Sequence, residues 1–237
     1  MIKHLLKQVA NQFGYDIQHL PTDPIARQQL DLLRKHNINL IFDVGANVGQ
    51  YAQKMRTLGY KGRIVSFEPQ PDAFQLLRQK AAVDSNWQAV ETALGNFDGE
   101  TTINVSQNSY SSSILDILPA HLESAPDASY IDRVPVKVQK LDSILAQYFD
   151  LDSHLFVKID TQGFERQVFE GALHSLSKIK GFQMELSLLP LYEGEMLMQE
   201  MIDLLRNYGY CLQLIESGYR HHKTSEIIQL ECYFLKF

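Results

Sequence analysis

Short apolar runs alternate along the chain with longer stretches in which apolar residues recur every three or four positions. The first pattern is typical of buried strands and the second of helices, and their alternation predicts a parallel α/β sheet. Parallel strands are expected at 39–44, 63–68, 87–94, 154–160 and 181–187. Helices are expected from Asn47 to about Gly59, from near Pro71, from Phe164 to His174 and from Glu195 to Tyr208.

The two ends of the chain depart from this alternation. Two helices come first, and the second starts at Asp23-Pro24, where Asp can cap and Pro can fill the first helical position. Residues 1–37 are therefore expected to form an N-terminal helical extension on a domain that spans 38–237. Two adjacent apolar runs, YCLQLIE and IIQLECYFLKF, end the chain and predict a terminal antiparallel hairpin.

The first helix leaves two interpretations open. Its apolar residues lie opposite Lys3 and Lys7, so it can pack on the domain or on a second copy of the chain, or it can lie on a membrane surface. We favour packing, because one or two lysines make a weak electrostatic anchor.

Residues 95–140 interrupt the regular alternation. They contain a short alternating strand, TTINVS, and a serine-rich loop, QNSYSSS, that includes Ser112. Insertions of this kind usually lie over the ligand end of an α/β sheet. The loop is therefore expected to bind a polyhydroxylated ligand or a ligand carboxylate, and His121 further along the insertion is a second residue of interest.

The turn after the first strand, DVGANVGQ, is typical of a nucleotide-binding sheet, in which ligands bind beyond the carboxyl ends of the strands. A dinucleotide fingerprint requires G-x-G-x-x-G, but Asn47 and Gln50 replace two of its glycines. An NAD-linked oxidoreductase is therefore disfavoured, though it stays the alternative enzyme. Asn47 and Gln50 are expected to cap the helix. Glu68, at the end of the second strand, suits the ribose hydroxyls of a dinucleotide or of another nucleoside cofactor, so it does not separate these two kinds of site.

Five segments together resemble the FkbM family of S-adenosylmethionine-dependent methyltransferases over roughly residues 38–190: FDVGANVGQYA, FEP, ALGN, NSYSSSIL and VKIDTQGFERQVFEGA. The sharpest marker is KID-x-x-G-x-E after the fourth strand. The resemblance implies a class I methyltransferase (Rossmann-like) fold, doubly wound, with a mostly parallel seven-stranded sheet and a C-terminal antiparallel hairpin. It also implies O-methylation of a hydroxyl on a sugar, a glycan or another natural product.

The resemblance, together with the position of each residue at a strand end or in the serine-rich loop, predicts roles for individual residues. Those expected to bind S-adenosylmethionine are Asp43, Gly45, Asn47, Gly49, Glu68, Ala93, Leu94 and Ser112. Those expected to be catalytic are Asp160, Glu185 and Glu165. Relatives often end the fifth strand in Glu-x-His, whereas this chain has Glu185-Leu186-Ser187, so its proton acceptor is expected to differ.

Methyl transfer to a hydroxyl needs a destination for the proton, either a base or a metal-bound group. Asp160 and Glu185 lie at the ends of strands that are expected to be neighbours, so they can act as base and orienting group or as ligands for Mg²⁺. We favour the metal-free arrangement, because two carboxylates alone make a poor magnesium site. Glu165 also has a purely structural interpretation, as a carboxylate in the first turn of a helix.

Composition narrows the class of protein. The net charge of -6 argues against nucleic-acid binding, and the chain has no apolar run long enough to span a membrane. Its first residues lack a continuous apolar core and a small-residue cleavage site, so they are not expected to form a signal peptide. Cys211 and Cys232 are expected to be buried, reduced thiols in a cytoplasmic protein. The alternative to an enzyme is a non-catalytic partner subunit that retains the fold as an interaction module.

Overall fold

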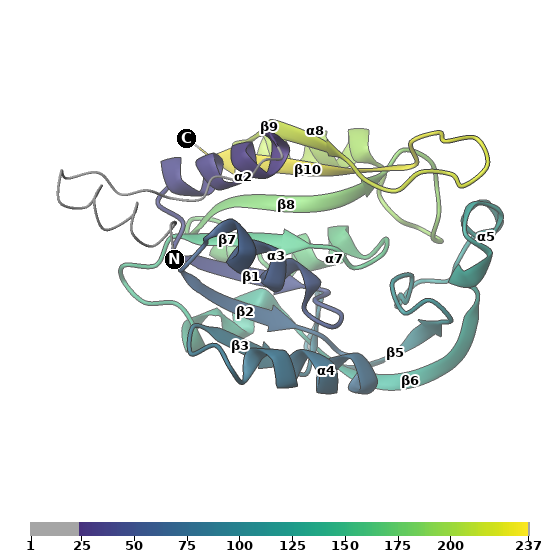
Figure 1. The fold of residues 1–237 in the computed structure, drawn as a ribbon, viewed down its shortest axis with the longest axis horizontal. Coiled ribbons are helices and arrows are strands. Elements are labelled where there is room, and N and C mark those ends of the chain that lie inside the picture. Colours follow the sequence, from purple (N-terminus) through teal and green to yellow (C-terminus); the bar gives the residue numbers. More distant parts are fainter. Residues whose placement is uncertain (1–23, 237) are drawn as a thin grey trace, which may run out of the picture.

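A seven-stranded sheet forms the centre of the structure, a computed structural model that describes residues 24–236 (Figure 1). Its strand order is β3-β2-β1-β7-β8-β10-β9. β10 runs antiparallel to both neighbours, and all other pairs are parallel. The strands are β1 (Leu40–Val44), β2 (Arg63–Phe67), β3 (Trp87–Val90), β7 (Leu155–Ile159), β8 (Ile179–Ser187), β9 (Tyr210–Ser217) and β10 (Gln229–Lys236). The predicted fold, including the terminal hairpin, is confirmed.

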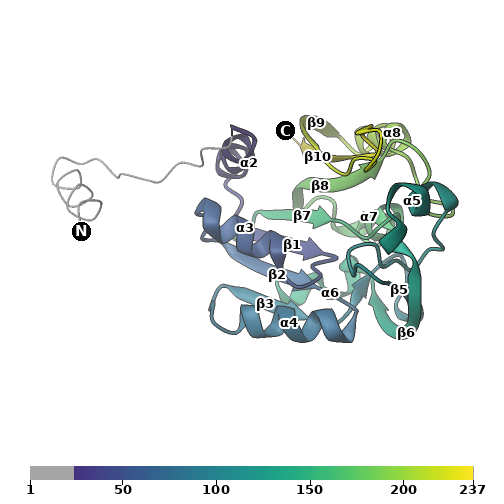
Figure 2. The ribbon, with the colours of Figure 1, turned by 45° about the vertical axis from the view of Figure 1, so that its right-hand side comes forward.

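Helices cover both faces of this sheet, because the central strands are apolar on both sides. In β1, Ile41 packs into one core, while Leu40 and Phe42 pack into a second core on the opposite face. The first core is closed by α2 (Pro24–Lys35), α3 (Gln50–Leu58) and α4 (Pro71–Ala81), and the second by α6 (Leu141–Ile144), α7 (Glu165–Glu170) and α8 (Met198–Asn207). Figure 2 shows α3 and α4 on the near side of β1 and β2.

The predicted third strand, 87–94, is wrong in its second half. After β3, a hydrogen bond from the Thr92 N–H to the Val90 carbonyl (3.1 Å) turns the chain out of the main sheet. β4 (Ala93–Leu94) then joins a separate three-stranded sheet of order β4-β6-β5, with β5 (Gly99–Ser106) and β6 (Tyr130–Gln139). Most of the insertion is therefore a second small sheet, which also carries α5 (Pro119–Ser124).

Three helix boundaries also differ from the prediction. The first helix after β1 starts at Gln50, and its N-cap is Gly49, with φ 87° and no capping side chain. Asn47 instead bonds the Val48 N–H and the Ser109 carbonyl, so the predicted capping pair is wrong. The segment expected as one helix over 164–174 is α7 followed by a 3₁₀ turn, and α8 starts at Met198.

α2 packs on the sheet as part of its core. Leu30 and Leu33 are buried in the same cluster as α3, and the buried Gln29 amide donates to Gln183 of β8 (3.2 Å). The first predicted helix lies outside the described residues, so the extension over 1–37 stays a prediction. Between Pro24 and Lys236, no helix combines the length and the apolar character that crossing a bilayer requires.

The two cysteines differ in exposure. Cys232 of β10 is buried, as expected, but Cys211 of β9 is exposed. Because β9 is the edge strand, alternate residues along it face solvent, and the prediction of a buried thiol is wrong for Cys211.

Gly171, at the end of α7, provides a test of how the two sheets fit together. A Cβ there would lie 1.9 Å from the carbonyl oxygen of Gly95, directly after β4, so Gly171→Ala should lower the free energy of unfolding by about 3 kcal/mol. Gly59→Ala is the control: it adds a Cβ to open space at φ 95° and should cost about 1 kcal/mol. Urea unfolding measures both values, and equal losses would contradict the close contact at Gly95.

Candidate active site

A cavity of about 540 Å³ lies at the carboxyl ends of the central strands, a volume typical of small-molecule sites. Its walls come from the turn after β1, the end of β2, the serine-rich loop, the segment after β7, and strands β8 to β10. The sequence-predicted residues that line it are Gly45, Asn47, Glu68, Ala93, Leu94, Ser112, Asp160 and Glu185. The structure thus brings together most of the predicted site from distant parts of the chain.

Gly45 allows two loops of the site to touch. Its φ is +72°, and a Cβ there would lie 1.9 Å from the backbone carbonyl oxygen of Asp160. Its N–H donates to the Phe67 carbonyl (3.1 Å), which fixes the turn against the end of β2. Only glycine satisfies both the backbone conformation and this close approach.

Glu68 is a buried carboxylate held by the backbone on both oxygens. Oε2 accepts the Asn47 N–H (2.7 Å), and Oε1 accepts the Gln70 N–H (2.8 Å). Burial raises the pKa of Glu68 to about 7, and the two N–H donors oppose that rise. Each oxygen keeps a lone pair for a ligand hydroxyl, and the carboxylate cannot rotate away from the cavity.

The serine-rich loop is tied to the site at several points. The Asn47 side-chain amide donates to the Ser109 carbonyl (2.9 Å), and the Ser113 hydroxyl donates to the Gln162 carbonyl (2.7 Å). Ser112 lines the cavity, and its hydroxyl oxygen accepts the Ser106 N–H (3.0 Å). The loop is therefore a fixed wall of the cavity, as its position in the sequence predicted.

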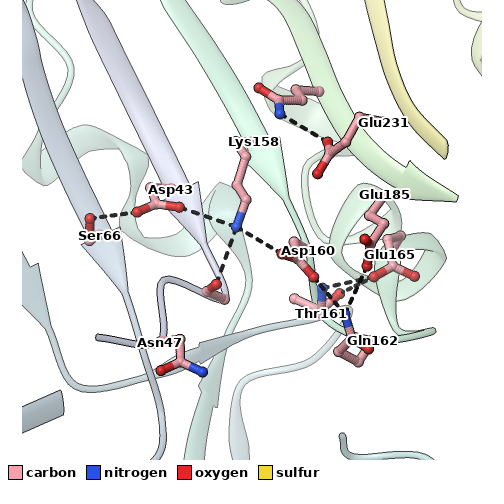
Figure 3. A network of polar contacts seen from close by, with 12 residues as sticks. Asp43, Asn47, Ser66, Lys158, Asp160, Thr161, Gln162, Glu165, Glu185 and Glu231 are labelled. Carbon is pink, nitrogen blue, oxygen red and sulfur yellow. Dashed lines mark hydrogen bonds and ion pairs between the residues drawn. The ribbon is translucent and has the colours of Figure 1, made fainter. Parts of the chain in front are cut away.

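Lys158, the first residue of the KID marker, is a buried cation to which the sequence analysis assigned no role (Figure 3). Its Nζ lies 3.4 Å from carboxylate oxygens of both Asp43 and Asp160, and it donates to the Gly45 carbonyl (3.2 Å). Burial lowers the pKa of Lys158, but the Asp160 and Asp43 charges outweigh burial and raise it overall. The signal in the sequence was a lysine inside the otherwise apolar strand LFVKI.

Gln162 joins the two carboxylates predicted to be catalytic. Its side-chain amide donates to Asp160 Oδ1 (2.8 Å) and to Glu185 Oε2 (2.9 Å), as Figure 3 shows. Burial, then the Asp160 and Glu231 charges, raise the pKa of Glu185 well above its ordinary value. The predicted proximity of Asp160 and Glu185 is therefore confirmed. Within residues 24–236, no group of three or more His, Cys, Asp or Glu side chains is placed to hold a metal ion.

Glu231 is a second cavity residue that the sequence analysis did not identify. It lies on β10 directly opposite Glu185 of β8, and it accepts a hydrogen bond from the Gln183 amide (2.9 Å). Burial raises the pKa of Glu231, and the charge of Asp160 adds to the rise. Glu231 lies in the cavity because β10 pairs with β8. The sequence of β10 alone does not reveal which strand it pairs with, so this position could not be predicted.

Three predicted site residues lie behind the cavity wall. Asp43 is fully buried and bonds Ser66 (2.9 Å) as well as Lys158, and Gly49 packs against the ring of Trp87. Glu165 accepts the Thr161 N–H (2.8 Å), and burial raises the pKa of Glu165 to about 7. Their contacts support the lining residues, and their predicted direct roles stay predictions.

The comparisons with known proteins agree with one another. Residues 43–212 match the model of the methyltransferase FkbM domain. The 2-O-methyltransferase NoeI of Sinorhizobium fredii (strain NBRC 101917 / NGR234) is 26% identical over 216 residues, which cover 88% of each chain. The methyltransferase sdnD of Sordaria araneosa is 22% identical over 189 residues, or 70% of this chain and 67% of that protein.

Among solved structures, the methyltransferase FkbM of Methylobacillus flagellatus KT is similar to 84% of this chain, with 15% identity and a TM-score of 0.48. The present chain spans 44% of the length of that chain.

The Lys158 ion pairs give a prediction about stability. Lys158→Met leaves Asp43 as a buried, unpaired charge and should lower the free energy of unfolding by about 3–5 kcal/mol. The double variant Asp43→Asn/Lys158→Met should recover much of this loss, because no buried charge then lacks a partner. Lys61→Met, at an exposed position, is the matched control. Denaturant unfolding measures all four proteins, and a double variant as unstable as Lys158→Met would contradict the pairing.

Proposed function

We propose, since the chain belongs to the FkbM methyltransferase family, that this methyltransferase transfers the methyl group of S-adenosylmethionine to a hydroxyl of a sugar, a glycan or another natural product. The observation that carries the proposal is a single cavity that joins the Glu68 end of β2 to the Asp160–Glu185 pair. One end offers acceptors for a ribose, and the other offers acceptors for a proton. Similarity to a 2-O-methyltransferase supports a hydroxyl as the acceptor.

The residues at the β1–β2 end of the cavity fit S-adenosylmethionine. Glu68 presents two fixed carboxylate oxygens for the ribose hydroxyls, and Ala93 and Leu94 form an apolar wall suited to the adenine. Gly45 lets the methionine part approach the backbone, and Ser112 can donate to its carboxylate. When bound, this cofactor supplies a methyl group already activated by its sulfonium. The protein's contribution is position and management of the proton.

Glu185 is the group that we propose receives the proton of the acceptor hydroxyl. Its pKa is raised by burial and by neighbouring carboxylates, which makes it a better proton acceptor than an ordinary glutamate. Asp160, held by Lys158 and Gln162, is proposed to orient the hydroxyl by accepting a hydrogen bond. The Gln162 amide already supplies donors between the two carboxylates, so the proposal needs no metal ion there.

Cofactor binding is the first test. Calorimetry with S-adenosylhomocysteine should show binding to the wild-type protein, and Glu68→Ala should weaken it by about 1–3 kcal/mol, because the ribose hydroxyls lose their acceptors. The control Glu91→Ala, at an exposed position beside the site, should bind normally. Binding of NAD instead of S-adenosylhomocysteine would point to the oxidoreductase alternative and overturn the proposal.

Proton transfer gives a second test, measured as release of S-adenosylhomocysteine in the presence of a panel of sugars and glycans. Glu185→Gln should lower kcat by about 10²–10⁴-fold without weakening S-adenosylhomocysteine binding. In the wild type, kcat should fall as the pH drops through the raised pKa of Glu185, because protonated Glu185 cannot accept a proton. The control Glu193→Gln is exposed and should leave kcat unchanged. If the Glu185→Gln variant retained the kcat of the wild type, Glu185 could not be the group that receives the proton.

A further inference from the structure

Gln162 forms four hydrogen bonds with other residues around the cavity, three through its side chain and one through its backbone carbonyl. Its amide nitrogen donates to Asp160 and Glu185, its amide oxygen accepts the Tyr192 hydroxyl (2.7 Å), and its backbone carbonyl accepts the Ser113 hydroxyl (2.7 Å). These partners come from the ends of β7 and β8, the segment after β8, and the serine-rich loop. The side chain and backbone of Gln162 thus connect four segments around the cavity.

The backbone at this position is strained, and the surroundings hold it in place. Gln162 has φ 55°, a conformation that a residue with a Cβ adopts only at a cost. Gly163, with φ 93°, follows it, and a Cβ on Gly163 would lie 2.8 Å from Cβ of Tyr192. Tyr192 therefore packs against the turn at Gly163 and also donates a hydrogen bond to the side chain of Gln162. These two contacts fix the orientation of the Gln162 side chain.

Tyr192 determines which end of the Gln162 amide faces the carboxylates. Its side chain is fully buried and packs edge-to-face on His121 of α5, with ring centroids 5.0 Å apart. Its hydroxyl has one proton, and the shorter of its two contacts is the one to the Gln162 oxygen, at 2.7 Å against 3.2 Å to the Ser111 carbonyl. With the oxygen held by Tyr192, the amide N–H groups point at Asp160 and Glu185.

The charges around Glu185 show why these donors matter. Asp160 at the end of β7, Glu231 on β10 and Glu165 on α7 all disfavour ionised Glu185, in addition to burial. Gln162 is the hydrogen-bond donor that opposes them, while the cation of Lys158 pairs with Asp43 and Asp160. Within residues 24–236, Gln162 supplies the hydrogen bond to the Glu185 side chain, so its loss would leave Glu185 facing these carboxylates without that donor.

We propose that Gln162 is a positioning residue: its one amide group holds Asp160 and Glu185 in a fixed relative position and favours the ionised form of Glu185, the form that can accept the proton of the acceptor hydroxyl. The inference rests on the proposed function for the meaning of that proton. The arrangement of Gln162, Tyr192 and the two carboxylates is independent of it.

The test follows the ionisation of Glu185 directly, by carbon NMR of protein labelled at the glutamate carboxyl groups. The Glu185 signal is assigned by its loss in Glu185→Gln. A carboxylate that loses a donor is easier to protonate, so Gln162→Leu should move the Glu185 titration to higher pH by about one unit. The acidic limb of the kcat profile should move in the same direction. The control Gln199→Leu, on the exposed side of α8, should move neither.

Tyr192→Phe is the second variant, because it frees the Gln162 oxygen without touching either carboxylate and retains the aromatic packing on His121. It should move the Glu185 titration in the same direction by a smaller amount. An unchanged titration in both variants, even with lowered thermal stability, would show that Gln162 is only structural and would overturn the inference. Because the titration needs no turnover, a shift without methyl transfer to any acceptor would refute the proposed function and leave Gln162 as the positioning residue.

Discussion

The buried charge of Lys158 is the interaction on which the rest of the site depends. A lone ammonium in a protein interior is unstable, so this lysine requires its partners Asp43 and Asp160 and the carbonyl of Gly45. Those partners come from the end of β1, the turn that follows it and the end of β7. Pairing the charge therefore fixes the position of both loops relative to the strands, before any ligand arrives.

The two halves of the cavity achieve rigidity in different ways. At the Glu68 end, backbone N–H groups hold the carboxylate, so the geometry follows from the path of the chain alone. At the Glu185 end, side chains hold one another, and Gln162 is the common member. Backbone contacts survive most substitutions, whereas side-chain contacts are changed by a single one.

Much of this arrangement could be predicted from the sequence, because the order of parallel strands determines which strand ends lie next to one another. Asp160 directly follows β7 and Glu185 lies near the end of β8, its parallel neighbour, so their proximity followed from pattern alone. Which residues reach the cavity did not follow, because a turn residue can pack against the core instead, as the Gly49 backbone does against the ring of Trp87. The role of Lys158 was not predicted, because the function of a charged residue within an apolar strand can be inferred only when its ion-pair partners are known. The break after Val90 was missed because Ala93 and Leu94 resume the apolar pattern after only two polar residues, Glu91 and Thr92.

The second small sheet has a consequence for how such proteins diverge. Its strands pair with one another, and the serine-rich loop closes on its own strand through the Asn104–Ser113 bridge. Residues can therefore be inserted, deleted or exchanged at its outer end without altering the register of the seven main strands. Selection can then change residues at that outer end while the main sheet is inherited intact, and that end is the part of this chain where laboratory evolution would begin.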